Sequence, residues 1–374
     1  MPSRRTALLM LGSLPLAACA TPRAAPFAPG RAVVVRRGGR TLLSEVSGTG
    51  FTADTPFRVA SISKLATAET ARRLAAQGKL DLDADVADLL DHPFRHPGHP
   101  DVPVTVRDLV HHTSGIRDPA EYWVAAPGDI RSLITPEVWE AGHRPGRDFR
   151  YSNLNYGLLA TVLEVAGGER FDRLADRLLF TPLGLDAGFN WSGVSSAKRV
   201  RASALYRGEP GAWVPQVDES VPASGPTYLG SDADDLSAYV PGTNGTLFSP
   251  QGGLRASLND LAVLAEAVLA RPAMRETVWR HSGSGTSDED GHFLAWGPGH
   301  YIYEPDASPL PGRRLAGHFG EAYGFHGGVW VLDDGTLILH ADLGTADPSE
   351  PYTPTTPSLS RPNAEAFAKV ASVL

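Results

Sequence analysis

Residues 57–64 read Phe-Arg-Val-Ala-Ser-Ile-Ser-Lys, and this stretch decides how the rest of the chain is interpreted. Ser61 and Lys64 lie three residues apart, so on a helix they share one face. A lysine amine that is held close and partly desolvated can take the serine proton, which makes Ser-x-x-Lys a compact arrangement for covalent acyl transfer. The alanine- and leucine-rich segment 65–77, ended by Gly78, predicts a core helix with Ser61 buried at its N-terminus. Backbone N–H groups there favour a developing negative charge.

The same spacing occurs a second time, at Ser195 and Lys198. Gly193, Arg199 and Arg201 surround this copy, and no apolar stripe follows it. The pattern is typical of a solvated loop or helix start. We therefore place the nucleophile at Ser61.

Composition excludes several classes of function. A chain of 374 residues can bury a sizeable core and fits one large domain or two lobes. Its 39 glycines and 31 prolines indicate long irregular connections. The net charge of −8 is not gathered in one block, so nothing resembles a nucleic-acid footprint. A single cysteine rules out an internal disulfide.

The first residues predict export. Residues 1–18 have a charged start and an apolar run too short to span a membrane, as a signal peptide does. Leu-Ala-Ala-Cys at 16–19 resembles the bacterial lipobox, which makes Cys19 the lipidated first residue of the mature protein. Residues 19–30 would then be a tether. We expect a protein held at a bacterial membrane by a lipid anchor only, facing the periplasm or cell exterior. The alternative is a plain secretory signal cut near Ala20.

Strand signals lie at both ends of the chain, with helical patterns between them. The segments 31–46 and 327–339 read as hairpins around Gly-Gly and Asp-Asp-Gly turns. The chain ends would meet in one antiparallel sheet with flanking helices, and a mainly helical lobe would be inserted at roughly 80–280 of a domain spanning 31–374. The cleft between two such lobes is a natural ligand site. The predicted helices are 65–77, 105–112, 155–166, 171–179, 258–270 and 363–374.

A Ser–Lys pair needs a group that carries the proton to the leaving group. Tyr151-Ser152-Asn153 is the only Tyr-x-Asn in the chain. Tyr151 can exchange protons with Ser61, while Asn153 can bond a substrate amide or hold Lys64 in place.

Five segments in order resemble the serine hydrolase family that includes class C β-lactamases, D-alanyl-D-alanine carboxypeptidases and related esterases. They span nearly all of residues 31–374. The resemblance implies the two-lobed α/β fold of the β-lactamase/transpeptidase type. The segments are 57–64, Leu-Val-His-His-Thr-Ser-Gly-Ile at 109–116, Tyr-Ser-Asn at 151–153, 251–262, and Gly-His-Phe-Gly-Glu-Ala-Tyr-Gly-Phe at 317–325.

The resemblance also implies roles for single residues. Ser61 would be the acylated nucleophile, Lys64 its proton acceptor, and Tyr151 the general base and acid. Asn153 would contact substrate. The backbone N–H groups of Ser61 and Glu321 would form the oxyanion hole, worth a few kcal/mol per donor.

The segment 317–325 departs from the β-lactamases of the family. His318, followed by Gly320, stands where they carry a lysine, and no Lys-Thr-Gly occurs in the chain. A neutral imidazole attracts a substrate carboxylate less than an ammonium does, and the charge of Glu321 opposes it further. An ester or amide with a hydrophobic acyl part is therefore expected. Its pocket is assigned to four aromatic residues: Phe319, Tyr323, Trp123 and Trp213.

We therefore expect an exported serine hydrolase that uses neither metal nor cofactor. The loop with His92, His96 and His99 carries prolines and lacks helical ligand geometry, so it predicts a surface loop. A D-alanyl-D-alanine carboxypeptidase or weak β-lactamase is the alternative substrate assignment. An alternative of another class is a non-catalytic lipoprotein that binds cell wall. The natural substrate and the oligomeric state stay open.

Overall fold

The computed structural model describes residues 27–125, 127–209, 212–216, 236, 239–281, 295–345, 352–354 and 357–374. The predicted signal peptide and Cys19 lie outside these residues. No helix within the described ranges is both long and apolar enough to cross a membrane.

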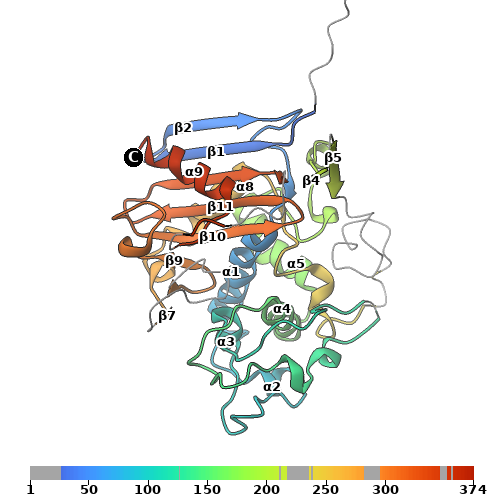
Figure 1. Cartoon of the computed structure of the whole chain (residues 1–374). Coiled ribbons are helices and arrows are strands. Elements are labelled where there is room, and N and C mark those ends of the chain that lie inside the picture. The colour runs from blue at the N-terminus through green and yellow to red at the C-terminus, as the bar shows by residue number, and fades with distance from the viewer. Residues whose placement is uncertain are drawn as a thin grey trace, which may run out of the picture.

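An eight-stranded sheet organises the molecule (Figure 1). Strand β1 pairs with β2 on one side and with β12 on the other, both antiparallel, so the two ends of the chain meet as predicted. Gly38 and Gly39 make the hairpin turn with positive φ angles of 55° and 76°. In sheet order the strands are β2 (Arg40–Ser47), β1 (Arg31–Arg37), β12 (Leu337–Asp342), β11 (Phe325–Leu332), β10 (Leu315–Ala322), β9 (Tyr301–Tyr303), β8 (Ala295–Trp296) and β7 (Trp279–Arg280).

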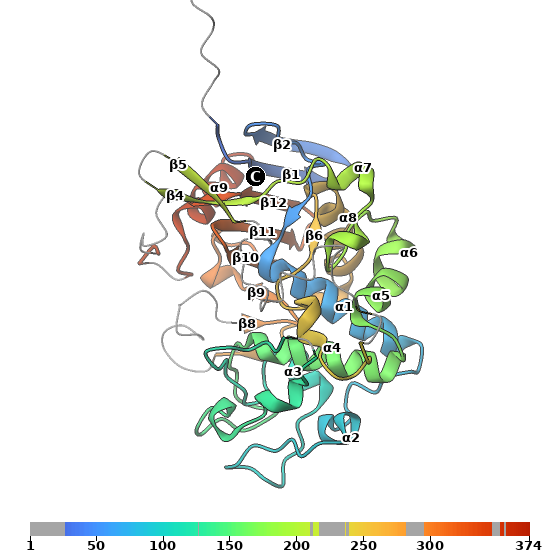
Figure 2. The same cartoon turned by 90° about the vertical axis from the view of Figure 1, so that its right-hand side faces the viewer.

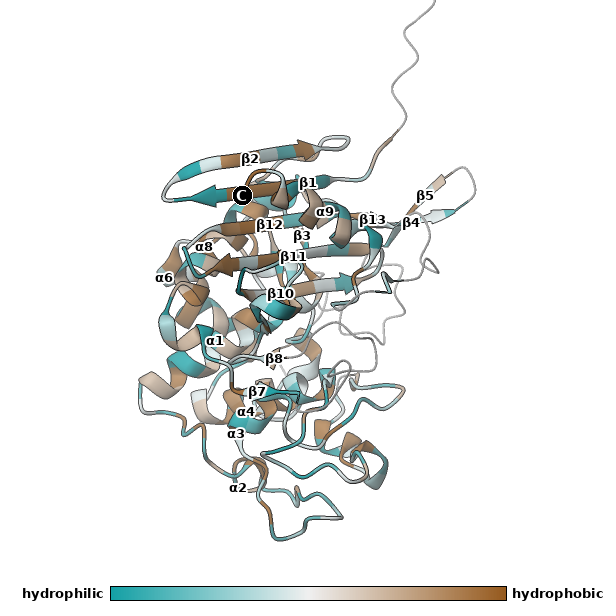
Figure 3. Cartoon of the chain, turned by 60° about the vertical axis from the view of Figure 1, so that its left-hand side comes forward, coloured by the Kyte–Doolittle hydropathy of each residue, from teal (hydrophilic) through white to brown (hydrophobic). Residues whose placement is uncertain are grey.

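Helices cover both faces of this sheet. Alternate residues of β11 point to opposite faces: Val329 and Val331 belong to the core shared with α8 (Leu258–Leu269), and Trp330 packs with Phe367 of α9 (Arg361–Ala371). Figure 3 shows the resulting hydrophobic stretches along β11 and β12. Helix α1 (Ser63–Ala76) contacts β10 and α8 on one side and the inserted helices on the other. The pair at 61 and 64 therefore lies between the sheet and the inserted part.

Among the described residues between α1 and α8 the longest helix is α4 (Asn153–Gly167), which packs against α1. It begins two residues earlier than predicted. The segment 171–179 forms α5 (Phe171–Ala175) and then a π-helical turn at Asp176–Phe180. The other helices are short: α2 (Val86–Leu90), α3 (Val106–His111), α6 (Thr181–Leu183) and α7 (Ser196–Arg199).

Two small sheets were not predicted. Strand β3 (Phe57–Arg58) pairs with β6 (Arg255–Ala256) just before the nucleophile. Strand β13 (Gly344–Thr345) pairs with β4 (Leu205–Glu209), which forms a hairpin with β5 (Ala212–Gln216) at the side of the main sheet (Figure 2). Strands β3, β6 and β13 have only two residues each and carry too little periodicity to be found in a sequence.

Candidate active site

Ser61 lies in a 3-10 turn, Ala60–Ile62, that runs directly into α1. The residue before it, Ala60, has a left-handed φ of 48°, a conformation that costs a non-glycine residue about 1–3 kcal/mol. Such strain presents the serine on a sharp turn from β3 into the helix. Ser61 is partly exposed, which corrects the expectation that it is buried. The hydroxyl is thereby open to a substrate.

Lys64 is fully buried and its amine is held by three acceptors. Its Nζ lies 3.2 Å from Ser61 Oγ, 2.9 Å from Asn153 Oδ1 and 3.0 Å from the carbonyl oxygen of Gln251. Burial lowers the pKa of Lys64 from 10.5 to about 7, and the charge of Asp118 opposes this shift. Near neutral pH a large share of Lys64 is therefore uncharged and able to take the Ser61 proton.

Tyr151 stands at the other side of Lys64, just ahead of α4. Lys64 Nζ lies 4.7 Å from the centre of the Tyr151 ring. The ring stacks on His112 with centroids 4.4 Å apart. The structure thus brings Lys64 together with Tyr151 and Asn153, which lie almost ninety positions later in the chain, as the sequence predicted.

Asp118 is a site residue that the sequence analysis missed. Its carboxylate accepts hydrogen bonds from Ser152 Oγ (2.7 Å), Asn153 Nδ2 (2.8 Å) and the Leu154 backbone N–H (2.9 Å). It therefore caps the first turn of α4 and turns the Asn153 amide so that Oδ1 faces Lys64. No local signal marks Asp118, because its partners lie more than thirty residues later in the chain.

His112 contacts Tyr151, Ser152 and Asn155 and so supports the start of α4. It ends α3 with a φ of 57° and is fully buried. Its Nδ1 accepts the Ser152 backbone N–H at 3.2 Å and lies 3.2 Å from Asn155 Nδ2. Burial and the nearby Lys64 hold the pKa of His112 well below its ordinary value. A neutral ring therefore packs against Tyr151.

Strand β10 passes beside the nucleophile turn. A Cβ on Gly320 would stand 2.4 Å from the Val59 carbonyl oxygen, so only glycine allows this approach. Glu321 follows Gly320 in β10, the strand that contacts the Ala60–Ile62 turn. Its carboxylate is turned away, with Ser360 Oγ 3.3 Å from Oε1 and Asn363 also bonded to it. The role of its backbone N–H in the oxyanion hole stays a prediction.

His318 is fully buried between the rings of Tyr301 and Trp296. Its Nδ1 lies 2.5 Å from the Phe319 carbonyl oxygen, which can only accept, so Nδ1 carries the hydrogen. Burial and Lys64 keep the pKa of His318 well below its ordinary value. The position therefore offers no positive charge to a substrate, as its sequence suggested.

Two of the aromatic pocket candidates do not face the site. Phe319 packs against Trp330 and Phe367 under α9, because it must point to the face of β10 opposite His318. Trp213 lies in the side hairpin next to Gly344. Tyr323 lies in the turn after β10 and contacts Arg58. Trp123 is half-buried in the loop that approaches Thr246.

The comparisons with known proteins agree with this geometry. A model of the Beta-lactamase family matches residues 18–353. The chain belongs to the β-lactamase family. A D-aminopeptidase from Brucella anthropi is 25% identical over 328 residues, which cover 83% of this chain and 55% of the relative. This β-lactamase-family chain thus spans about half the length of the curated relatives it matches.

Solved structures share the fold of this family member. A D-stereospecific amidohydrolase from Streptomyces sp. superposes with a TM-score of 0.63 at 19% identity, covering 92% of this chain and 94% of the other. EstCE1, a hydrolase with promiscuous acyltransferase activity, gives a TM-score of 0.65 at 20% identity, with the same coverage. At these identities the likeness concerns the fold alone.

The second Ser-x-x-Lys of this family member is structural. Ser195 caps α7, and its backbone N–H donates to Asp186. Lys198 Nζ forms a buried ion pair with Asp260 at 2.5 Å. The histidine loop is also structural in part, since His96 is buried and its Nε2 contacts the Glu140 carbonyl oxygen. Within the described ranges no group of His, Cys, Asp and Glu side chains could hold a metal ion.

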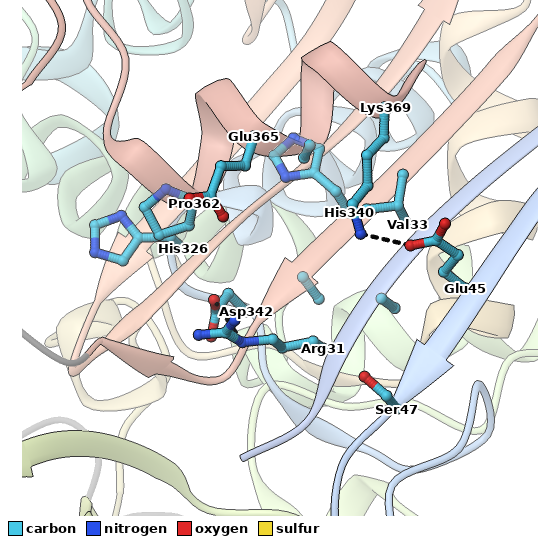
Figure 4. Close-up of a pocket in the computed structure, with 13 residues that line it drawn as sticks. Arg31, Val33, Glu45, Ser47, His326, His340, Asp342, Pro362, Glu365 and Lys369 are labelled. Carbon is cyan, nitrogen blue, oxygen red and sulfur yellow. Dashed lines mark hydrogen bonds and ion pairs between the residues drawn. The ribbon is translucent and has the colours of Figure 1, made fainter. Parts of the chain in front are cut away.

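A cavity of about 270 Å³ lies away from the catalytic residues, between α9 and strands β1, β2 and β12 (Figure 4). Four of the charged groups in its wall form two ion pairs with one another. Lys369 lies 2.5 Å from Glu45, and Arg31 lies 3.1 Å from Asp342. These pairs leave little charge to attract a ligand.

Proposed function

We propose that the chain is an exported serine hydrolase that cleaves an ester or amide through an acyl-enzyme on Ser61. One observation carries the proposal. The Lys64 amine lies 3.2 Å from the Ser61 hydroxyl and has a pKa lowered to about 7. A neutral amine at that distance is what a serine nucleophile requires.

Acylation begins with neutral Lys64. Its Nζ takes the proton of Ser61 Oγ while Oγ bonds to the substrate carbonyl carbon, and the carbonyl oxygen becomes an oxyanion. The bond to the leaving group then breaks, and the Tyr151 hydroxyl donates a proton to the departing oxygen or nitrogen. The Lys64 ammonium returns its proton to the Tyr151 phenolate. The products are the Ser61 ester, the protonated leaving group and neutral Lys64.

Deacylation reverses these transfers with water in place of the leaving group. Water loses a proton to the Tyr151–Lys64 pair as it adds to the ester carbon. Ser61 Oγ leaves with a proton from Lys64, and the acid product departs. Asn153 holds the Lys64 amine in reach throughout, since its own amide is fixed by Asp118.

Amides with D configuration are the second candidate substrates. Two similar proteins support this extension: the Brucella anthropi relative is a D-aminopeptidase, and the Streptomyces structure is a D-stereospecific amidohydrolase. Strong β-lactamase activity is disfavoured, because His318 is neutral and brings no cation to a substrate carboxylate.

We also propose that Cys19 carries a lipid anchor at a bacterial membrane. The support is the Leu-Ala-Ala-Cys pattern after an apolar run. Growth of expressing cells with radioactive palmitate tests it: the wild type should be labelled and Cys19→Ser should not. An unlabelled wild type would refute lipidation.

A fluorophosphonate probe tests the catalytic proposal. Wild type should be labelled, Ser61→Ala should not, and Ser195→Ala should be labelled like wild type because its serine caps a helix. Release of nitrophenol from 4-nitrophenyl esters should follow the same order. Absence of Ser61-dependent labelling and turnover would instead favour a non-catalytic cell-wall binder.

A further inference from the structure

Arg58 is a buried cation three residues before the nucleophile. Only 8% of its surface is exposed. Its Nε donates to the Gly252 carbonyl oxygen at 2.8 Å and its Nη2 to Ser249 Oγ at 3.3 Å. The guanidinium carbon lies 4.3 Å from the centre of the Tyr323 ring. These partners are neutral, and Nη1 donates to none of the described residues.

No described carboxylate pairs with Arg58. Two other buried side chains have opposite charges beside them: Glu69 is held by three arginines, and Lys198 by Asp260. An ionised group is costly to bury without an opposite charge. Since every arginine remains protonated in proteins, Arg58 keeps a positive charge that its surroundings do not balance. Such a cation attracts an anion that can reach Nη1.

The position of Arg58 puts that charge at the catalytic site. A Cβ on Gly252 would stand 3.8 Å from the Ala60 backbone and 4.0 Å from Arg58 Nη2. Gly252 therefore contacts both the nucleophile turn and the guanidinium, which are separated by about the width of one residue. Tyr323, whose ring covers the guanidinium, is half-buried at the edge of the core.

The charge also lies beyond the C-terminal end of β10, whereas His318 lies in the middle of this strand. Tyr323 follows His318 by five residues, a separation of at most about 16 Å for an extended chain. Glu321 lies between them. A substrate that reacts at Ser61 can therefore leave the His318 end neutral and still place an anionic group near Tyr323.

We propose that Arg58, packed against the ring of Tyr323, is a subsite for a carboxylate carried by the substrate. The inference rests on the proposed hydrolase function and narrows its substrates to anionic esters or amides. Guanidinium N–H groups match a carboxylate well, and the Tyr323 ring shields one face of the guanidinium from water. The competing explanation is that Arg58 only clasps the 249–253 loop, whose Gln251 carbonyl bonds Lys64.

Two esters with the same acyl chain length separate these explanations. Mono-4-nitrophenyl glutarate carries a terminal carboxylate and 4-nitrophenyl pentanoate a terminal methyl group. We expect Arg58→Gln to lower kcat/KM for the glutarate by about 10- to 100-fold, mainly through KM, and for the pentanoate by less than about 3-fold. Arg58→Lys, which keeps the charge but not the fork, should fall between. Spontaneous hydrolysis is subtracted with Ser61→Ala.

Arg255→Gln is the matched control. Arg255 is buried opposite Arg58 in the β3–β6 register and bonds the same loop at Gly253, but its guanidinium lies over Trp191. It should therefore reduce both esters to the same extent. Equal losses of both esters in Arg58→Gln would overturn the subsite and leave Arg58 a clasp. Thermal unfolding of each variant shows whether it is folded.

If neither ester is hydrolysed, a binding measurement tests the subsite. Ser61→Ala is titrated by calorimetry with glutaryl-4-nitroanilide and pentanoyl-4-nitroanilide. Tighter binding of the glutaryl compound, lost when Arg58→Gln is added, would support the subsite although the proposed hydrolase had failed. Equal binding of the two anilides would overturn the subsite.

Discussion

Asp118→Asn tests how the site sets the proton affinity of Lys64. The substitution removes the negative charge that raises the pKa of Lys64 against burial. Hydrogen bonds of 2.9 Å and 2.8 Å link Lys64 to Asp118 through the Asn153 amide, which puts the charges about 7 Å apart. With an effective dielectric constant near 20 this gives about 2 kcal/mol, and solvent near the half-buried carboxylate reduces it to about one pKa unit.

The expected result is a shift of the pH profile. Because neutral Lys64 is the active form, kcat/KM rises as pH passes the pKa of Lys64, near 7 in the wild type. A lower pKa in Asp118→Asn moves this rise to about pH 6. The measurement is ester hydrolysis from pH 5 to 9. The maximum rate should also fall. An asparagine cannot accept from all three donors that bond to Asp118, so the Asn153 side chain is held less firmly against Lys64.

Asp108→Asn is the matched control. Asp108 likewise accepts from three donors, the Thr105 backbone N–H, Thr105 Oγ1 and Thr113 Oγ1, and caps α3. Both variants should lose about 2–4 kcal/mol of unfolding free energy. Only Asp118→Asn should shift the pH profile. An unshifted profile in a folded Asp118→Asn enzyme would refute the reasoning that Asp118 acts on Lys64 by charge.

Three further predictions concern single residues. Tyr151→Phe should lower kcat for esters by about 10²- to 10⁴-fold, since the hydroxyl is the proton donor, and stopped-flow kinetics with unchanged near-UV circular dichroism would check this. Gly320→Ala should cost about 1–3 kcal/mol in thermal unfolding and lower kcat, because the new Cβ meets the Val59 carbonyl and moves β10 off the nucleophile turn. Glu69, whose three arginines lower its pKa from 4.5 to about 2, stabilises the fold by about 3 kcal/mol above pH 4.5, and this is lost as pH falls toward 2. Urea unfolding of Glu69→Gln should therefore show a deficit at pH 7 that shrinks at pH 3, and an equal deficit at both would contradict it.

The parts of the fold that the sequence predicted are those with local signals. The hairpin turn at Gly38 and Gly39 and the helix that follows Ser61 were found from turn residues and periodicity alone. The β3–β6 pair was not, because two-residue strands have no period. This pair matters for the site, because it places Arg58 and Arg255 next to the 249–253 loop. The Gln251 carbonyl of that loop accepts a hydrogen bond from Lys64.

The residues of the candidate site also divide into those with a local sequence signal and those without one. Ser61, Lys64, Tyr151 and Asn153 stand in short motifs and were found together. Two partners of this set, Asp118 and the Gln251 carbonyl, act through contacts between distant segments, and one of them is a backbone group that any residue provides. The assignment of Phe319 to the pocket was wrong for a simpler reason. On a strand it cannot share a face with His318, and the alternation of β10 was enough to exclude it.

The geometry of Lys64 explains why its tuning needs both parts of the molecule. Burial by α1 and its neighbours alone would push the pKa well down, and a lysine that is always neutral could not return a proton to Tyr151. Asp118 reaches it from the inserted part and opposes that shift. The amine is therefore poised near neutrality, where it can both accept and donate. Burial and the charge of Asp118 come from separate segments of the chain. A substitution that loosens the α1–α4 contact should therefore shift the pH profile even where substrate binding is unchanged.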